Sequence, residues 1–325
     1  MSKEGGKKMK KFKNEIYALV DEEFMSNFTG LHLNFMRDYY YKFYAEFCRR
    51  IKKTPLSSEK FYSNMHRRRI KIYQLCCPYC GSIHVMIHDR KIQGKGGYNY
   101  CPHCGRASAV ENILRQVSRF IRINGINRLG LKEFKKEHQE VEEWLLAYDC
   151  YQMEIVSLAS IIEVVFREYF EALLFINNLG LTNDYVKKVV RKHTGNDFMN
   201  IEKANDIFKK AYSIDIRSAL EKKVWTDLVD IVNLRNMMVH NNGRVDERFK
   251  KLDTYTRNKD KVIGELYKLE DSDIAGYLES VITAVEKITN VFLKKYYESR
   301  GKVIANHYFN DNGVALLFEK GDSIE

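Results

Sequence analysis

Two cysteine pairs with the same five-residue pattern constrain the fold of this chain more than any other feature. Cys77 and Cys80 lie in the sequence CPYCG, and Cys101 and Cys104 lie in the sequence CPHCG. Four thiolates with this spacing satisfy tetrahedral Zn²⁺ and fix a segment that is too small to bury a core of its own. Because four cysteines leave no open coordination position, we expect the zinc to be structural and not catalytic.

The residues around the two pairs, 71–110, are expected to form a zinc ribbon with one knuckle at each pair. Apolar residues alternate along the segment between the pairs and predict a β-hairpin whose turn is GKGG: Ile83, Val85 and Ile87. His84 and His88 alternate with these residues and are expected to face solvent. Cys76 adjoins the first pair and is an alternative to Cys77 as the ligand.

Basic residues are concentrated in the first part of the chain. The net charge is +11, and residues 1–130 carry 25 Lys and Arg against 10 Asp and Glu, whereas residues 131–325 carry 29 against 33. This concentration favours a polyanionic partner, with nucleic acid ahead of an anionic membrane. The candidate nucleic-acid contacts are arginines in basic stretches of the sequence: Arg67, Arg68, Arg69, Arg115, Arg119 and Arg244.

The apolar pattern is otherwise mostly helical, so we expect a mainly α fold. The expected segments are a basic helical region (1–70), the zinc ribbon (71–110), a basic helical connector (111–135), a helical bundle (136–300) and a C-terminal β-hairpin or tail (301–325). In the first segment an aromatic stripe is expected to be core, with a base-stacking platform as the alternative: Phe35, Tyr39, Phe43 and Phe47. The sequence NGINRLG is expected to end the connector helix, Asn312-Gly313 to form the hairpin turn, and Glu163 to pair with Arg167.

An apolar stretch in the bundle carries polar residues just before it breaks. Apolar residues recur there at helical spacing: Leu228, Ile231, Val232, Leu234, Met238 and Val239. The helix should stop at Asn241-Asn242-Gly243, because Asn and Gly tolerate the left-handed conformation that closes a helix. Arg235, Asn236 and His240 therefore gather at the C-terminal end of a packed helix.

Residues 234–241, LRNMMVHN, followed by Gly243 and Asp246, resemble the nuclease motif of the HEPN domain (higher eukaryotes and prokaryotes nucleotide-binding). In that motif an Arg is followed by a small polar residue and, four to six residues beyond, by a His. The resemblance covers residues 136–300 and implies a helical bundle, a homodimer and metal-independent RNA cleavage. The catalytic residues that it implies are Arg235, Asn236 and His240.

These residue types suit the cleavage of RNA without a metal ion. The neighbouring 2′-hydroxyl of RNA can attack the phosphate, so the site has to move protons and stabilise negative charge. Histidine can act as general acid or base, and arginine offers a charged planar fork to phosphate oxygens. Asn236 can orient either His240 or the phosphate. About 100° per residue places Asn236 and His240 on one helix face, with Arg235 about 140° from His240.

The resemblance implies a toxin or antiviral defence effector that cuts RNA, with tRNA a plausible substrate and an antitoxin or defence-system protein as a possible partner. No apolar run reaches the length of a membrane span, and the N-terminus lacks the apolar stretch of a signal peptide, so we expect a cytoplasmic protein without a membrane partner. The alternative is a non-catalytic zinc-ribbon module that binds nucleic acid or protein and uses the bundle as a dimerisation scaffold.

Overall fold

The computed structural model describes residues 15–20, 25, 30–93, 100–138, 142–179, 184–195, 197–256 and 262–311. These residues divide into two compact units, each with a core of its own. We call them the helical unit, residues 109–174 and 184–295, and the sheet unit, residues 15–108, 175–179 and 296–311. Helices dominate and the one sheet has three strands, so the predicted mainly α class is confirmed.

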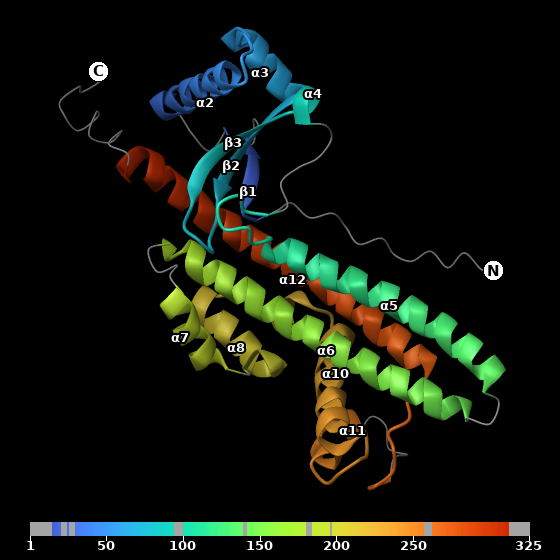
Figure 1. The fold of residues 1–325 in the computed structure, drawn as a ribbon. Coiled ribbons are helices and arrows are strands. Elements are labelled where there is room, and N and C mark those ends of the chain that lie inside the picture. Colours follow the sequence, from blue (N-terminus) through green and yellow to red (C-terminus); the bar gives the residue numbers. More distant parts are fainter. Residues whose placement is uncertain are drawn as a thin grey trace. The chain divides into compact units, whose positions relative to one another are not determined.

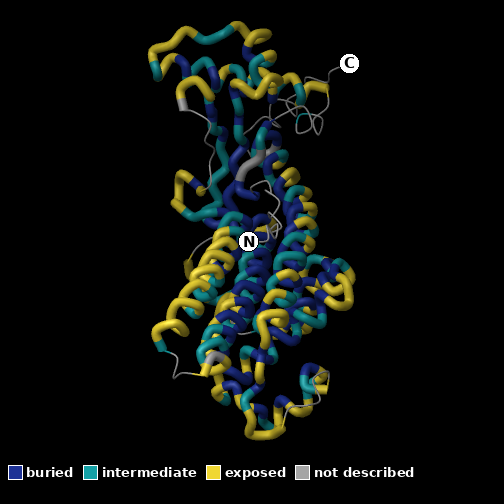
Figure 2. The backbone as a smooth tube through the Cα atoms, turned by 90° about the vertical axis from the view of Figure 1, so that its right-hand side faces the viewer, coloured by how far each residue is buried: buried dark blue, intermediate teal, exposed yellow. Residues whose placement is uncertain are grey.

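The helical unit is built on three long helices, α5, α6 and α12 (Figure 1). Its elements are α5 (Ala109–Glu137), α6 (Glu143–Ile176), α7 (Asp184–Thr194), η2 (Asp197–Met199), α8 (Ile201–Tyr212), α9 (Ile216–Ala219), α10 (Lys222–Asn241), η3 (Phe249–Lys251), α11 (Asp253–Thr256) and α12 (Asp271–Asn306), of which α6 and α12 end in residues of the sheet unit. Tyr169 of α6 stacks on Phe292 of α12 with ring centroids 4.0 Å apart, and its hydroxyl lies 2.6 Å from Thr289 Oγ1. Buried and exposed segments alternate along the helices (Figure 2), and α6 is buried over most of its circumference between Ile161 and Ile176.

Helix α5 continues through Gly125 and Gly130, so the break predicted at NGINRLG is wrong. Each glycine costs a helix about 1 kcal/mol relative to alanine, which weakens the helix without ending it. Contacts with α6 hold this part of α5. Arg128 Nη2 donates to Glu154 Oε2 at 3.2 Å, and Asn127 Nδ2 donates to the other carboxylate oxygen at 3.4 Å. Glu154 is only 2% exposed, and a buried carboxylate needs such partners.

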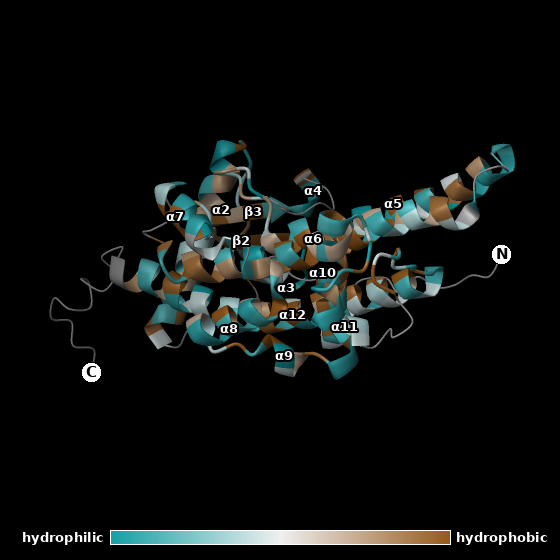
Figure 3. Ribbon diagram, turned by 90° about the horizontal axis from the view of Figure 1, so that it is seen from below, coloured by the Kyte–Doolittle hydropathy of each residue, from teal (hydrophilic) through white to brown (hydrophobic). Residues whose placement is uncertain are grey.

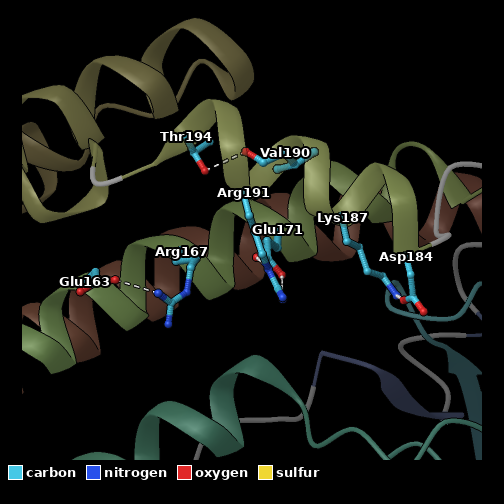
Figure 4. A network of polar contacts seen from close by, with 8 residues as sticks. All are labelled: Glu163, Arg167, Glu171, Asp184, Lys187, Val190, Arg191 and Thr194. Atoms are coloured by element: carbon cyan, nitrogen blue, oxygen red, sulfur yellow. Dashed lines mark hydrogen bonds and ion pairs between the residues drawn. The ribbon is translucent and has the colours of Figure 1, made fainter.

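Charged residues on one side of α6 form a chain of polar contacts with α7 (Figure 4). The predicted pair of Glu163 and Arg167 is confirmed, with Nη1 and Oε1 2.7 Å apart. One turn further along α6, the buried Glu171 accepts a hydrogen bond from Arg191 Nε of α7 at 3.1 Å. The contact between Arg191 and Glu171 connects two helices and therefore constrains the position of α7. The pair of Glu163 and Arg167 lies within α6 and has no such effect.

The sheet unit has its strands in the order β1-β2-β3, all antiparallel. Its elements are β1 (Tyr17–Val20), α2 (Gly30–Arg50), α3 (Ser58–His66), β2 (Ile70–Cys76), β3 (Ile83–Asp89), α4 (Arg90–Gln93), the end of α12 and the π-helix η4 (His307–Asp311). Ser57 caps the N-terminus of α3, because its side chain accepts a hydrogen bond from the backbone N–H of Lys60. Ile70 pairs with Asp89 and Cys76 with Ile83, which fixes the register of the central hairpin.

The side chain of Gln74 on the central strand connects three parts of the sheet unit. It accepts a hydrogen bond from Tyr40 of α2 at 3.1 Å, donates to the backbone carbonyl of His84 on β3 at 3.4 Å, and lies 3.1 Å from the Tyr308 hydroxyl. Gln74 is fully buried, so all of its hydrogen-bonding capacity has to be met inside the protein. These partners lie 34, 10 and 234 residues away in sequence.

Three expectations for the sheet unit need correction. The partner of β3 is β2, the strand before the first cysteine pair, and the predicted turn GKGG lies outside the described residues. Residues 17–20 form a strand where helix was expected, because pairing with β2 satisfies their backbone groups. The buried stripe of α2 lies one residue beyond the predicted one and consists of Met36, Tyr40, Tyr44 and Cys48.

The predicted C-terminal hairpin is wrong in its described part. Residues up to Asn306 continue α12, and His307–Asp311 form a π-helix, whereas Asn312 and Gly313 lie outside the described residues. Ile304 and Tyr308 are four residues apart and both are buried, which is the spacing of a helix face. Burial in the sheet unit therefore outweighs the strand propensity of this segment.

Candidate functional site

The four cysteines of the two pairs come together in the sheet unit, where their sulfur atoms all lie within 4.8 Å of one another. Cys77 Sγ is 3.9 Å from Cys104 Sγ, and Cys80 Sγ is 3.8 Å from Cys101 Sγ. Zn–S bonds of about 2.3 Å in a regular tetrahedron place the sulfurs about 3.8 Å apart. The cluster therefore has the ligand type, number and spacing that a tetrahedral zinc ion needs.

The two knuckles have the same backbone geometry. Gly81 and Gly105 both have φ of +73°, and each donates its N–H to the carbonyl of the first cysteine of its pair, Cys77 or Cys101, at 2.9 and 2.8 Å. A residue with a Cβ rarely adopts this conformation, which explains the glycine after each pair. The repeated CPxCG pattern thus encodes two equal turns that present two sulfurs each.

Burial and hydrogen bonding act differently on the four thiols. Burial raises the pKa of Cys77 and of Cys101. Burial also acts to raise the pKa of Cys80, but hydrogen bonds from Ser82 outweigh it and bring the pKa to about 6. A bound cation would hold all four groups as thiolates, because a metal ion ligates the deprotonated sulfur.

Cys76 is not a ligand, which resolves the alternative at the first pair. Cys76 pairs with Ile83 in the sheet, and its sulfur atom does not belong to the cluster of four. Its backbone carbonyl accepts a hydrogen bond from the Tyr296 hydroxyl at 3.4 Å, and burial raises the pKa of its thiol to about 12. The Cys76 thiol therefore belongs to the core of the sheet unit.

The expectation that both strand histidines face solvent is wrong for His88, which is 4% exposed, while His84 is half-buried. Both faces of β3 are packed in this part of the sheet unit. The alternation of apolar and polar residues therefore does not identify a face of the strand that is exposed to solvent. Burial lowers the pKa of each imidazole, with a further contribution from His103 at His84 and from Lys71 at His88. Neither histidine belongs to the metal cluster.

The C-terminal end of α10, in the helical unit, has one anchored face and one exposed face. Leu234, Met237 and Met238 are buried in a core cluster with Tyr151 and Ile155 of α6. Three other side chains of the last two turns form an exposed strip: Asn236, Val239 and His240. Val239 is 45% exposed, so its predicted place in the core is wrong, and Met237 occupies that face instead.

The structure brings Arg235 and Asn236 together. Arg235 is half-buried, and its Nη1 donates to Asn236 Oδ1 at 2.9 Å. His240 lies one turn further along the exposed strip, and its imidazole makes no hydrogen bond with the residues that the structure describes. Because Asn236 precedes His240 by four residues, these two side chains share one side of the helix, and the guanidinium of Arg235 is held beside them through its hydrogen bond to Asn236.

The turn after α10 is closely defined by backbone contacts. As predicted, the helix ends at Asn241, with Asn242 at φ +47° and Gly243 at φ +72°. Tyr267 N donates to the carbonyl of Gly243 at 2.9 Å, and the guanidinium of Arg244 donates to the carbonyl of Gly264 at 2.8 Å. The side chain of Arg244, a predicted nucleic-acid contact, thus contributes to the structure of this turn.

The other predicted nucleic-acid contacts occupy different elements and differ in their ion pairs. Arg67, Arg68 and Arg69 are exposed at the end of α3 in the sheet unit. On α5 of the helical unit, Arg115 pairs with Glu111 at 2.7 Å, whereas Arg119 is exposed and has no ion pair with a described residue. Among the helices described, none combines the length and the low polarity that crossing a membrane would take.

The chain matches no protein-family model, and no curated protein or solved structure is significantly similar to it. The function of the two sites is therefore inferred from their own residues and geometry.

Proposed function

We propose that the protein is a metal-independent endoribonuclease of HEPN type whose catalytic residues are Arg235, Asn236 and His240. The observation that carries the proposal is their position at the exposed end of α10. An arginine that is paired with an asparagine lies one turn before an imidazole that has no hydrogen-bond partner among the described residues. The opposite helix face is fixed in a core cluster, so the strip is held on a rigid element, as a catalytic site requires.

The proposed reaction is a transesterification within the RNA strand. The 2′-oxygen attacks the adjacent phosphorus, the bond to the 5′-oxygen of the next nucleotide breaks, and a 2′,3′-cyclic phosphate remains. One proton leaves the 2′-hydroxyl and one joins the departing 5′-oxygen, and His240 is the general acid for the second step. The guanidinium of Arg235 stabilises the charge on the phosphorane oxygens, and Asn236 orients that guanidinium.

The proposed site is completed by a second copy of the chain, since one His240 cannot serve as acid and base in the same step. Exposed apolar side chains offer contact area for such a dimer: Ile126 and Leu129 of α5 and Met153 of α6 are 66%, 68% and 65% exposed. Hydrophobic positions lie among hydrophilic ones along α5 (Figure 3). The same surface supports the second candidate function, a non-catalytic dimerisation scaffold beside a zinc module.

The test is cleavage of total RNA in the presence of EDTA. We expect the wild type to leave 2′,3′-cyclic phosphate ends, and His240→Ala and Arg235→Ala each to lower the rate by about 10²–10⁴-fold, the usual contribution of one acid–base or charge-stabilising group. The controls are Val239→Ala, whose exposed side chain lies in the strip but not in the motif, and Arg248→Ala, which removes an exposed arginine outside the motif. Zinc content after incubation shows whether the structural site survived the chelator.

Cleavage by His240→Ala at the wild-type rate would refute the assigned site. Absence of cleavage in every variant, with a stable dimer and retained zinc, would favour the scaffold. For a toxin or defence effector that cuts cellular RNA, expression of the wild type should arrest growth and His240→Ala should relieve the arrest. An antitoxin or defence-system partner would act by covering the exposed strip.

A further inference from the structure

We infer that the open end of the β2–β3 hairpin is a separate binding surface for the RNA phosphate backbone. The surface, which we call the basic rim, consists of Arg67, Arg68, Arg69, Lys71, Arg90 and Lys91. It extends the proposed function by stating where the sheet unit holds the substrate. Three of its residues are not among the nucleic-acid contacts predicted from the sequence: Lys71, Arg90 and Lys91.

The register of the hairpin assembles the rim. The first zinc knuckle closes one end of the hairpin, where Cys76 pairs with Ile83. At the other end Ile70 pairs with Asp89, and Arg90 N donates to the carbonyl of Arg69 at 3.1 Å. Two basic segments separated by some twenty residues of sequence are thus joined backbone to backbone at the end of the sheet remote from the metal cluster.

The charge of the rim is not neutralised by the described residues. Five of its six cationic side chains are exposed, Lys71 is half-buried, and none of them has an ion pair with a residue that the structure describes. The one acidic residue in positions 67–91 is Asp89, and one of its oxygens accepts from the backbone N–H of Lys91 at 2.8 Å. Three other exposed cations of the unit do have acidic partners: Lys42 pairs with Asp38, and Arg49 and Arg50 pair with Glu46.

The backbone at Arg68 supports a role for its side chain. Helix α3 ends in a Schellman arrangement, in which Arg69 N donates to Asn64 O at 2.9 Å and Arg68 N to Met65 O at 2.8 Å. Arg68 has φ of +54°, the left-handed position where glycine is the common residue. An arginine at this position strains the backbone and adds a charge to the rim. Stability alone would favour glycine there.

A phosphate backbone fits the rim better than a membrane surface does. Interfacial membrane binding needs apolar side chains that enter the lipid, and the exposed large apolar residue beside the rim is Ile92, at 41%. Several unpaired arginines and lysines in two adjoining segments match a strand of regularly spaced phosphates, which arginine binds with two parallel hydrogen bonds. Counterion release then makes such binding strongly dependent on salt.

The experiment compares two triple variants of the full chain in the His240→Ala background, which removes cleavage from the measurement. Arg67→Gln/Arg69→Gln/Arg90→Gln alters the rim, and Lys42→Gln/Arg49→Gln/Arg50→Gln removes the same charge from paired sites of the same unit. Binding of a labelled single-stranded oligoribonucleotide is followed by fluorescence anisotropy at several salt concentrations. The rim variant should bind more weakly, and its slope of log K against log salt should fall by about 2, at about 0.7 per lost phosphate contact.

Arg68→Gly separates a binding role from a structural one. Glycine relieves the left-handed strain, so the thermal midpoint should be unchanged or higher while the RNA affinity falls. Equal binding by the two triple variants would overturn the inference, and so would loss of binding to phosphatidylserine vesicles with unchanged RNA binding. These outcomes leave the proposed nuclease untouched, since its test depends on Arg235 and His240 and reads cleavage instead of affinity.

Discussion

Replacing Cys101 with serine is expected to abolish stoichiometric zinc binding, to unfold the two cysteine turns and to destabilise the sheet unit, while the helical unit stays folded. Cys101 is fully buried, and its sulfur lies 3.8 Å from that of Cys80. A structural zinc ion contributes an apparent 10–16 kcal/mol to folding in zinc-finger peptides, about as much as the whole stability of a small domain. Loss of one ligand removes most of that contribution.

The described contacts between the knuckles are too weak to replace the metal. Arg106, which follows the second pair, lies over the ring of Tyr79 in the first knuckle, with 3.9 Å from Cζ to the ring centroid. Such a cation–π contact contributes about 0.5–2 kcal/mol, roughly a tenth of the zinc contribution. Besides its turn, the second knuckle has a hydrogen bond from Cys101 N to the carbonyl of Arg106 at 2.8 Å and an isolated bridge between Tyr100 and Ala107.

Zinc content by atomic absorption, thermal unfolding and amide hydrogen exchange test this prediction. Cys48→Ser is the matched control, because Cys48 is also a buried cysteine of the sheet unit but is not in the metal cluster. The control should keep its zinc, and both variants should keep most of their helical circular dichroism, since the long helices have a core of their own. Wild-type protein without zinc, or Cys101→Ser with normal zinc, would disprove the assignment.

The metal cluster was predictable from sequence because its geometry is local. Each CPxCG turn sets the position of two sulfurs through contacts within five residues, and the glycine at φ +73° follows directly from the pattern. The stop of α10 was predictable for the same reason, since Asn and Gly at the C-cap act over a single turn.

The features that the sequence did not reveal depend on distant partners. The continuity of α5 through two glycines is stabilised by Glu154, which lies 26 residues after Arg128. The partner of β3 was misplaced because alternation identifies a strand but not its neighbour. Only Arg67, Arg68 and Arg69 of the basic rim were predicted from the sequence. The remaining residues were missed because the register of the hairpin, which brings Arg90 next to Arg69, is not visible in the sequence. A sign of the basic rim was present in the charged sequence DRK directly after the alternating strand residues.

The second large effect is expected at Gly243, in the turn that follows the proposed catalytic residues. Its φ of +72° disfavours any other residue, and a Cβ built there would lie 1.6 Å from the Tyr148 hydroxyl oxygen and 2.9 Å from Tyr148 Cζ. Backbone strain costs about 1–2 kcal/mol, and the steric overlap adds about 1–3 kcal/mol or more. Gly243→Ala should therefore lower the free energy of unfolding by about 2–5 kcal/mol.

Gly264 provides the matched control, because it has φ of +87° and no atom within 4 Å of an added Cβ. Gly264→Ala should show the backbone strain alone, and the difference between the two variants in urea denaturation isolates the overlap with Tyr148. In a double-mutant cycle, Tyr148→Phe should rescue Gly243→Ala only in part, because Cζ remains 2.9 Å from the new Cβ. Equal destabilisation by the two alanines would mean that Tyr148 does not hold this turn. With a displaced turn, the Gly243–Tyr267 hydrogen bond is lost and the last turn of α10, which carries His240, loses its anchor.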